Sequence, residues 1–463
     1  MMSIQSKIMS QYQNNNPEKF SNSFLTLKEN DDPKKYLEVA MHTLDSIEGI
    51  TYLRMEELQH RVYETMTEEE LKENKLNISV DKSLLKIYRF YFNIEKDDRK
   101  EEIFMDLFYP ELIKGQYFLI NNNRYFPTFQ LLDSGFFNTS NAVVLKTLIM
   151  PIVMELKEEA LSLNIFKKKM SPFFYYFAKF NFYETLEYFG IKDKILIIDN
   201  LNELNNYENE FKVFEINKKF YFCIVKEAYE EDYLIYNSIK NCFNSRLKIE
   251  KIEDINYWKK KLGTLFSNTT DKIAKANSTL ISFERGLDLL NKELLRLPED
   301  DKKDIYSIIR YMIRNYMHLK TRNNCDLANK RIRSNEYLIY PLLRRFTAFV
   351  RRINNGRKIT FEKLCDFRPS KGFLVKCMIT NELLRYDNSC NSANIVSKLR
   401  ISQSGFQSQF SSGAVKIEYR TNHHSFIGKI GLLETSAGDP GCSMVASPFL
   451  ELYDNNHFTE KEL

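Results

Sequence analysis

Apolar and polar positions along the chain alternate between helical and strand spacing, which predicts a mixed α+β protein. In 33–47 apolar side chains recur at three- and four-residue steps, and Gly49 follows, so a helix is predicted there. Aromatic and β-branched residues fill 87–94, typical of a strand. In 115–129 two aromatic runs flank three asparagines, which favours a hairpin.

The middle of the chain continues this mixture. Residues 173–189 are rich in aromatics at helical spacing, and the run 194–199 predicts a strand. A second hairpin is expected at 211–225, where apolar and polar residues alternate around an Asn-Lys turn. Apolar stripes predict further helices at 283–297 and 305–316. Stripes of this kind are typical of an ordinary core rather than of a cofactor site.

Composition narrows the class of protein. With 463 residues, of which 43% are apolar and 28% charged, the chain is expected to form two or three soluble globular domains. No apolar run approaches the ~20 residues of a membrane-spanning helix, and no secretory segment opens the chain. The polar, Asn-rich segment 11–30 predicts a loose N-terminal arm. A net charge of +5 does not by itself indicate nucleic-acid binding.

The sequence contains no recognisable catalytic or metal-binding motif. Seven scattered cysteines form no C-x-x-C pair, so no metal site is expected. Signatures of phosphate-binding loops, dinucleotide folds, zinc proteases and serine hydrolases are absent from the sequence. His423 and His424 are adjacent, but they lack a nucleophile or metal partner. No catalytic residue is therefore predicted.

Basic residues gather in two places. Between 330 and 358 nine Lys/Arg stand against one acid, Glu336, and Arg345 and Arg352 share a helix face one heptad apart. Between 387 and 445 the pattern predicts short elements and loops, a surface suited to a polyanion. The basic residues of that second segment are Lys398, Arg400, Lys416, Arg420 and Lys429.

The segment 387–445 resembles part of the β (second-largest) subunit of multisubunit, DNA-dependent RNA polymerases. The family has a segment of the type DxxNPLSEITHKRRIS, a glycine-bearing fork loop, and then RDVHPTHYGRVCPIETPEG. The first block keeps Asp387, Ile395, Lys398, Arg400, Ile401 and Ser402 in register. The second block keeps Arg420, His423, Gly428, Glu434, Thr435 and Gly438. The family proline and glutamate after ET are Ser436 and Ala437 here.

Two further blocks occur in the family's order. DLANKRIRSNEYL, at 326–338, is similar to the family's DHLGNKRIRSVGEL. Upstream, Gly115 and Arg124 keep the spacing of a hairpin in the family's protrusion domain, although the family glycine after Asn is missing. The resemblance implies a multidomain α+β fold with mixed helices and short antiparallel sheets. Its expected parts are an N-terminal arm (1–32), a protrusion-like domain (33–142 and 326–383), a lobe-like domain (143–325) and the start of the fork (384–463).

The resemblance also implies site residues. Those expected to contact nucleic acid are Lys330, Arg331, Arg333, Lys398, Arg400, Lys416, Arg420 and Lys429. Those expected to face the fork and the active centre are Asp387, Ser402, His423, Glu434 and Thr435. The segment from Gln403 to Lys416 would form the fork loop. The catalytic Mg²⁺ of this family is held by an NADFDGD motif of the largest subunit, which is absent here. No cofactor is expected on this chain, and Mg²⁺ is expected on another subunit.

The sequence stops soon after the second fork block, so we expect the N-terminal piece of a split β subunit of giant-bacteriophage type. Expected partners are a C-terminal β fragment, β′ fragments, where one exists a promoter-specificity subunit, the DNA template and the RNA transcript, and no membrane. The cytoplasm of the infected bacterium and the virion are both open as locations. Two alternatives also stay open: a stand-alone single-strand nucleic-acid-binding protein and a virion structural protein.

Overall fold

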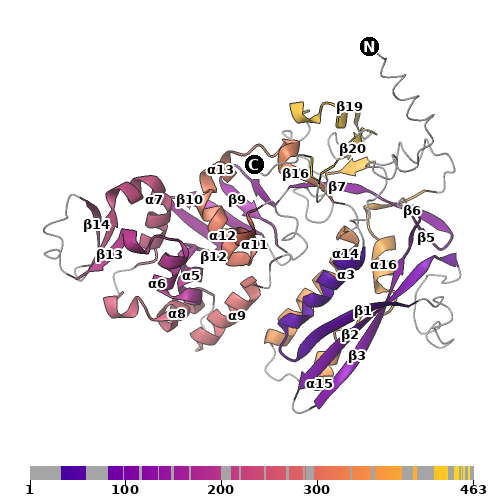
Figure 1. Cartoon of the computed structure of the whole chain (residues 1–463), viewed down its shortest axis with the longest axis horizontal. Coiled ribbons are helices and arrows are strands. Elements are labelled where there is room, and N and C mark those ends of the chain that lie inside the picture. Colours follow the sequence, from indigo (N-terminus) through magenta and orange to yellow (C-terminus); the bar gives the residue numbers. More distant parts are fainter. Residues whose placement is uncertain are drawn as a thin grey trace. The chain divides into compact units, whose positions relative to one another are not determined.

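The computed structural model forms two compact units, which are described separately (Figure 1). Met1–Ser134 and Asn323–Leu463 make the first unit, and Gly135–Arg322 makes the second. Helices and mostly antiparallel sheets confirm the predicted α+β class. Among the described residues no helix could span a membrane. The described residues are 33–58, 82–96, 99–113, 117–133, 135–147, 151–165, 168–199, 210–217, 220–243, 247–266, 271–284, 287, 297–333, 336–355, 360–387, 400–403, 422–435, 443–447, 450, 452–453 and 457–458.

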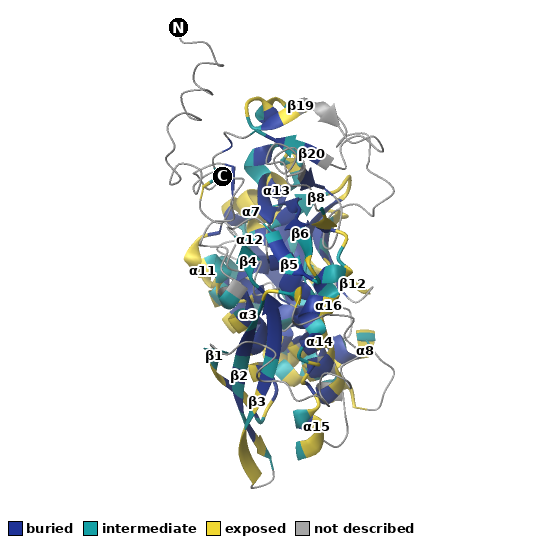
Figure 2. Cartoon of the chain, turned by 90° about the vertical axis from the view of Figure 1, so that its right-hand side faces the viewer, coloured by how far each residue is buried: buried dark blue, intermediate teal, exposed yellow. Residues whose placement is uncertain are grey.

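A three-stranded antiparallel sheet in the first unit packs against helices. Alternation along its central strand buries Phe90, Phe92 and Ile94, and the Phe92 ring lies 4.9 Å from that of Phe367. The start of its third strand, Arg99 to Glu102, pairs with residues 93–96 of the central strand and is exposed (Figure 2). The strands pair in the order β1 (Ile50–Leu58), β2 (Leu85–Lys96) and β3 (Arg99–Pro110). The helices are α3 (Pro33–His42), α14 (Glu336–Asn355), α15 (Phe361–Cys365) and α16 (Phe373–Ile379).

Gly49 forms the tight connection between the first helical segment and β1. Its φ is +94°, and a Cβ at this position would lie 2.4 Å from the backbone oxygen of Glu95. The Gly49 oxygen in turn accepts a hydrogen bond from the Glu95 amide at 2.9 Å. A side chain would therefore clash with backbone rather than with a movable group, which explains the glycine at this position. The helix predicted at 33–47 is α-helical only to His42, and a 3₁₀ turn (Leu44–Ser46) follows it.

The predicted hairpin at 115–129 is confirmed. Asn121 and Asn122 form its two-residue turn with φ of 52° and 61°, the left-handed region that asparagine tolerates better than most residues. A strand from near residue 385 pairs with the second arm of the hairpin, so distant segments share one sheet. This sheet has the order β17 (Leu384–Tyr386), β6 (Asn123–Pro127), β5 (Tyr117–Ile120) and β4 (Leu112–Ile113).

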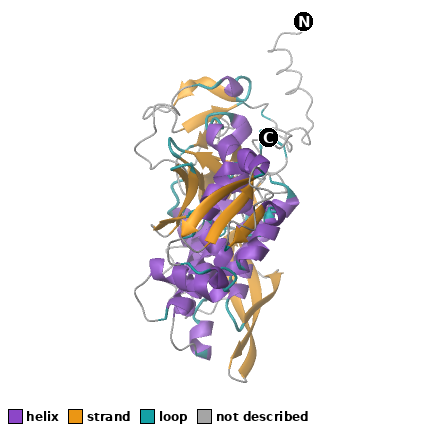
Figure 3. Cartoon of the chain, turned by 90° about the vertical axis from the view of Figure 1, so that its left-hand side faces the viewer, coloured by secondary structure: helices purple, strands orange, loops and turns teal. Residues whose placement is uncertain are grey.

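The second unit combines two antiparallel sheets with helices (Figure 3). The larger sheet has the order β12 (Lys168–Met170), β11 (Ala160–Ile165), β10 (Ile152–Lys157), β9 (Ala142–Leu145) and β8 (Phe136–Asn138). The smaller has the order β13 (Ile195–Ile198), β15 (Phe220–Val225) and β14 (Phe211–Asn217). The helices are α5 (Phe173–Phe180), α6 (Phe182–Tyr188), α7 (Lys226–Lys240), α8 (Ile255–Phe266), α9 (Lys272–Glu284), α11 (Glu299–Lys302), α12 (Ile305–Arg314) and α13 (Tyr316–Thr321).

Aromatic side chains dominate the core of the second unit. The fully buried Trp258 lies 4.8 Å from the Phe177 ring, and its indole nitrogen donates to the Ile252 carbonyl at 2.7 Å. The Tyr176 hydroxyl donates to the backbone oxygen of Tyr306 at 2.7 Å. Burial of large rings whose polar atoms find backbone partners is a strong source of stability.

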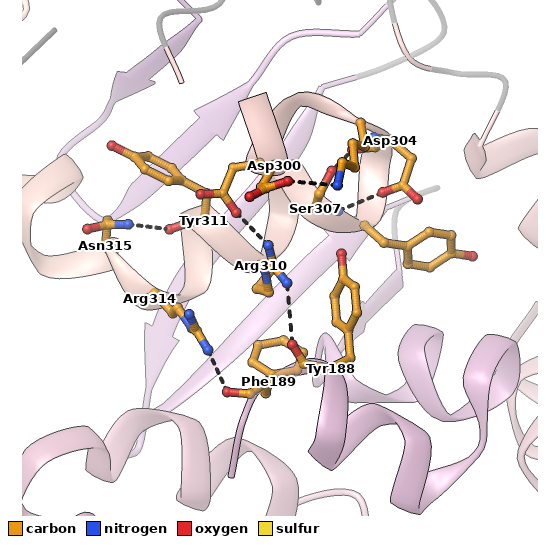
Figure 4. Close-up of polar contacts among 12 residues, drawn as sticks. Tyr188, Phe189, Asp300, Asp304, Ser307, Arg310, Tyr311, Arg314 and Asn315 are labelled. Atoms are coloured by element: carbon orange, nitrogen blue, oxygen red, sulfur yellow. Dashed lines mark hydrogen bonds and ion pairs between the residues drawn. The ribbon is translucent and has the colours of Figure 1, made fainter. Parts of the chain in front are cut away.

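Both ends of α12 are fixed by polar contacts (Figure 4). At its start, the Asp304 carboxylate accepts from the Ser307 amide at 2.7 Å, and the Ser307 hydroxyl accepts from the Asp304 amide at 2.9 Å. From the body and the last residue of the helix, Arg310 and Arg314 donate to the carbonyl oxygens at 188–189, at the end of α6. Carbonyls that have no partner within a helix end are thereby satisfied.

Most predicted elements of the second unit are confirmed. The strand at 194–199 and the hairpin at 211–225 are present, and the helix predicted at 305–316 is present as α12, which ends at Arg314. The predicted helical stretch 173–189 is two helices, because Asn181 takes a φ of 71° between them. The predicted helix at 283–297 and the N-terminal arm lie almost wholly outside the described residues. The identification of these ranges with a protrusion and a lobe stays a prediction.

Candidate nucleic-acid interface

Four separate stretches of the chain meet in one five-stranded sheet of the first unit. We call it the motif sheet, because the blocks at 326–338, 387–402 and 420–445 each supply at least one strand. The first fork block runs parallel to β7, whereas the other neighbouring pairs are antiparallel. The order is β16 (Lys330–Arg333), β7 (Phe129–Asp133), β18 (Arg400–Ser402), β20 (Ser443–Ala446) and β19 (Ile430–Thr435).

A small apolar core holds the motif sheet together. Ile332, Ile401 and Met444, one from each motif block, are buried in the same cluster. Phe129 and Leu131 of β7 complete the cluster from the strand that follows the hairpin. The strands therefore share buried surface as well as backbone hydrogen bonds, and the three blocks are parts of one structural unit.

The cations of the NKRIRS block lie inside the protein. The Lys330 ammonium is 2.6 Å from the Asp133 carboxylate, and these side chains are only 6% and 7% exposed. Lys330 and Asp133 are opposite each other in the pairing of β16 with β7. A buried charge is tolerated when an opposite charge meets it at close range. The cross-strand pair thus fixes the register of the two strands.

Arg331 and Arg333 have internal partners as well. Arg331 donates to the Glu336 carboxylate at 2.6 Å, and both side chains are almost fully buried. Burial opposes the charge of Arg331, but the nearby Glu336 carboxylate outweighs it and raises the pKa of Arg331. Arg333 donates to the side-chain oxygen of Gln130 on β7, and its guanidinium lies 4.9 Å from the centre of the Tyr340 ring.

The expected phosphate contacts of Lys330, Arg331 and Arg333 therefore differ from what these side chains do in this structure. Each is at most 5% exposed as a residue, and each donates to a protein group rather than to solvent. Their shared role in the structure is to join β16 to β7 and to α14. Contact with nucleic acid by these three residues stays a prediction.

The segment around His423 packs on the residues that precede NKRIRS. His423 caps a short 3₁₀ helix (His424–Phe426) by accepting from the Ser425 amide, and its Nε2 lies 3.1 Å from Asn323 Nδ2. The Ser425 hydroxyl accepts from the Leu327 amide at 3.1 Å. His423 and Ser425 thus link the second fork block to the chain at 323–327, where the NKRIRS block begins.

The remaining predicted site residues are placed only in part. Asp387 directly follows β17 and donates its amide to the Arg124 carbonyl, Ser402 is buried at the end of β18, and Lys429 donates to the Phe458 carbonyl at 3.2 Å. Arg400, Glu434 and Thr435 lie in strands, and only their backbone belongs to the described part of the structure. Lys398, Lys416 and Arg420 lie outside the described residues.

Partners that the motif analysis missed complete the site. Asp133 and Gln130 hold the buried cations, but they are 197 and 203 residues away in sequence, so no local pattern reveals them. His457 is 1% exposed and forms a backbone bridge with Arg331, against the edge of β16. Glu336 follows Arg331 by five residues and could have been identified as a partner. Among the described residues, no group of three or more potential ligands is placed to hold a metal.

Comparison with protein families identifies the chain. A model described as non-virion RNA polymerase subunit matches residues 1–462. The chain belongs to the non-virion RNA polymerase subunit family. A search of curated proteins finds no match.

Membership of the non-virion RNA polymerase subunit family makes this chain a component of a viral RNA polymerase, with other polymerase subunits as partners. The family description also separates its members from polymerases carried in the particle. It favours action in the infected cell, and packaging in the virion, which the sequence left open, receives no support from it. In this non-virion RNA polymerase subunit, the motif sheet unites the segments that resemble polymerase β subunits.

Proposed function

We propose that this chain is the N-terminal, non-catalytic part of a split β subunit of a DNA-directed RNA polymerase, of giant-bacteriophage type. It would form one side of the DNA channel, through protrusion-like and lobe-like domains, and the fork loop beside the RNA–DNA hybrid. The stand-alone single-strand binder and the virion structural protein are the competing functions, and the polymerase family favours neither.

The motif sheet is the observation that carries the proposal. Three blocks that resemble β subunits in sequence are spread over more than a hundred residues, yet they supply strands of one sheet, in which β7 lies between the strand of the NKRIRS block and those of the fork blocks. Short sequence matches that arose by chance would have no reason to meet in space. Their meeting supports a shared structural origin with the β-subunit fork, and it agrees with the family assignment.

In the proposed function some basic residues hold strands together and others contact nucleic acid. Lys330, Arg331 and Arg333 tie the strands that carry the fork. Lys398, Arg400, Lys416, Arg420 and Lys429 would contact the phosphates of the hybrid and of the downstream strands. Such contacts are independent of sequence and sensitive to salt.

Bond formation would take place on other chains. Nucleotide addition by two-metal chemistry needs carboxylates that hold Mg²⁺ in line with the attacking 3′ oxygen. The proposed partners supply them: a C-terminal β fragment and β′ fragments, one of which bears the NADFDGD motif. A promoter-specificity subunit would join this set where one exists. Our chain would position template and transcript, bind no cofactor and perform no chemical step.

Purification from infected cells tests the proposal. A tagged copy of the full chain should co-purify with several other chains, one bearing NADFDGD, and with RNA synthesis from a DNA template. Recovery of the chain alone, with single-strand binding intact, would instead support the stand-alone binder.

Site-specific crosslinking in that assembly tests the fork assignment. A photoreactive phenylalanine analogue at Phe410, within the expected fork loop, should crosslink to template DNA or transcript in a stalled elongation complex. The same analogue at Met317 of the second unit, which is 53% exposed, gives for comparison the labelling from the lobe-like side of the proposed channel. Absence of nucleic-acid labelling from Phe410 would argue against a fork role.

A further inference from the structure

The structure divides the basic run 330–358 into two classes of cation. Those of β16 are buried and matched by protein groups. Those farther along, on α14, include Arg345 and Arg352, which are exposed on one face of the helix. The first class is enclosed by the protein, whereas the second is exposed to solvent.

Exposed arginines from α14 and from the turn between α15 and α16 converge on this face of α14. Arg345 reaches the backbone carbonyl of Arg368 at 3.5 Å, and Arg368 is itself exposed in the turn between α15 and α16. Arg352 pairs with Asp366, two residues before Arg368, at 2.7 Å. We call Arg345, Arg352 and Arg368 the arginine ridge. Ala348, also exposed, lies between its first two members on the same helix face.

Aromatic rings support two of the three guanidinium groups. Arg345 lies 5.5 Å from the centre of the Phe373 ring, and Arg352 lies 5.2 Å from that of Phe349. Stacking of this kind orients a planar guanidinium and reduces the entropy lost when it binds a ligand. The ridge is therefore partly arranged for binding before any ligand arrives.

The acid within the ridge does not neutralise it strongly. Arg352 and Asp366 are 61% and 69% exposed, and an ion pair of that exposure contributes only ~0–1 kcal/mol in water. A phosphate, which accepts two parallel hydrogen bonds from one guanidinium, can replace such a carboxylate. Arginine is also better suited than lysine to this bidentate contact.

We propose that the arginine ridge binds the phosphodiester backbone of nucleic acid, independently of sequence. The choice of nucleic acid as the source of phosphate rests on the proposed polymerase function, whereas the geometry of the ridge does not. An acidic segment of another subunit is the competing occupant, and the experiment below separates it from DNA and RNA.

Salt titration of binding provides the first test. The triple variant Arg345→Gln, Arg352→Gln, Arg368→Gln is compared, in the assembled polymerase, with a control that loses three exposed charges elsewhere. The control is Arg54→Gln, Lys157→Gln, Lys192→Gln, whose side chains are 59%, 74% and 51% exposed. Fluorescence anisotropy measures the affinity for a labelled DNA duplex, and for an RNA of equal length, over a range of salt concentrations.

Removal of one phosphate-binding cation lowers the slope of log K against log salt by ~0.9 for duplex DNA. We expect the ridge variant to lose about 2–3 from the slope on the nucleic acid that it binds, since three arginines are removed, and the control variant to keep the parental slope. Equal slopes for ridge variant, control and parent on both nucleic acids would overturn the proposal.

Crosslinking from Ala348 provides an independent test that removes no charge. A photoreactive analogue at this position should label DNA or RNA in the assembled polymerase, and the labelled species identifies the source. Labelling of another protein subunit alone would overturn the proposal. If the parental chain co-purifies with no other subunit, the proposed function fails. Both tests are then made on the full chain alone, and their results still decide whether the arginine ridge binds nucleic acid.

Discussion

The ion pair between Lys330 and Asp133 offers the most direct test of how the motif sheet is built. Its atoms are 2.6 Å apart and its side chains are 6% and 7% exposed, so removal of one partner leaves a buried charge without its counter-ion. Such a loss costs ~3–5 kcal/mol. Asp133→Ala should therefore destabilise the first unit by about that amount. The matched control, Asp366→Ala, breaks an exposed pair with Arg352 and should cost less than ~1 kcal/mol.

Urea unfolding separates the two units. Far-UV circular dichroism follows both units, whereas fluorescence of Trp258, the single tryptophan, reports the second unit alone. Asp133→Ala should shift a circular-dichroism transition to lower urea and leave the Trp258 transition in place. The double variant Lys330→Met, Asp133→Leu should recover most of the stability that Asp133→Ala removes, because it leaves no buried charge. If Asp133→Ala costs no more than Asp366→Ala, the buried pair is not what holds β16 to β7.

Three further changes probe the rest of the fold. Gly49→Ala should cost at least ~1–3 kcal/mol in thermal unfolding, because φ is +94° and the new Cβ meets the Glu95 oxygen at 2.4 Å, whereas Gly190→Ala, with φ +66° and open space around it, should cost less. Asp304→Ala removes the cap of α12 and should lower the stability of the second unit by ~0.5–2 kcal/mol in urea unfolding. Burial raises the pKa of the Cys242 thiol from 9.0 to about 12, so the unfolded chain releases this proton first. Between pH 9 and 12 the second unit should therefore lose more stability in urea melts than the variant Cys242→Ala loses, and equal losses would contradict this assignment.

Local signals predicted much of the fold because they depend on few tertiary contacts. The two-asparagine turn of the 115–129 hairpin takes positive φ at both residues, a preference carried by the residues themselves. Likewise the apolar stripe of α12 buries Ile308, Ile309 and Met312 on one face. Helical spacing did not reveal the break at Asn181, because a single left-handed residue hardly alters the hydrophobic pattern.

The environment of the NKRIRS block could not be predicted in the same way. A run of cations normally indicates a solvated face. Arg331 has a local partner in Glu336, but the groups that meet Lys330 and Arg333 are contributed by β7, about two hundred residues earlier in the chain, so the sequence near residue 330 shows these two charges without their partners. The exposed arginines of α14 carry the same local signal. The two classes differ in tertiary surroundings rather than in sequence pattern.

The strand register of the motif sheet connects the buried Arg333 to the strands of the fork blocks. Arg333 pairs with Gln130 on β7, Gln130 pairs with Ser402 on β18, and Ser402 pairs with Ser443 on β20. One row across four strands therefore runs from the NKRIRS block to both fork blocks. A one-residue slip of β16 against β7 would turn each side chain of the slipped strand to the opposite face and separate Arg333 from its acceptor. Because a buried guanidinium without an acceptor is costly, Arg333 opposes that slip. It thereby fixes the register of β16 against β7, the strand that also pairs with β18. The cations of the NKRIRS block thus hold the fork segments in place.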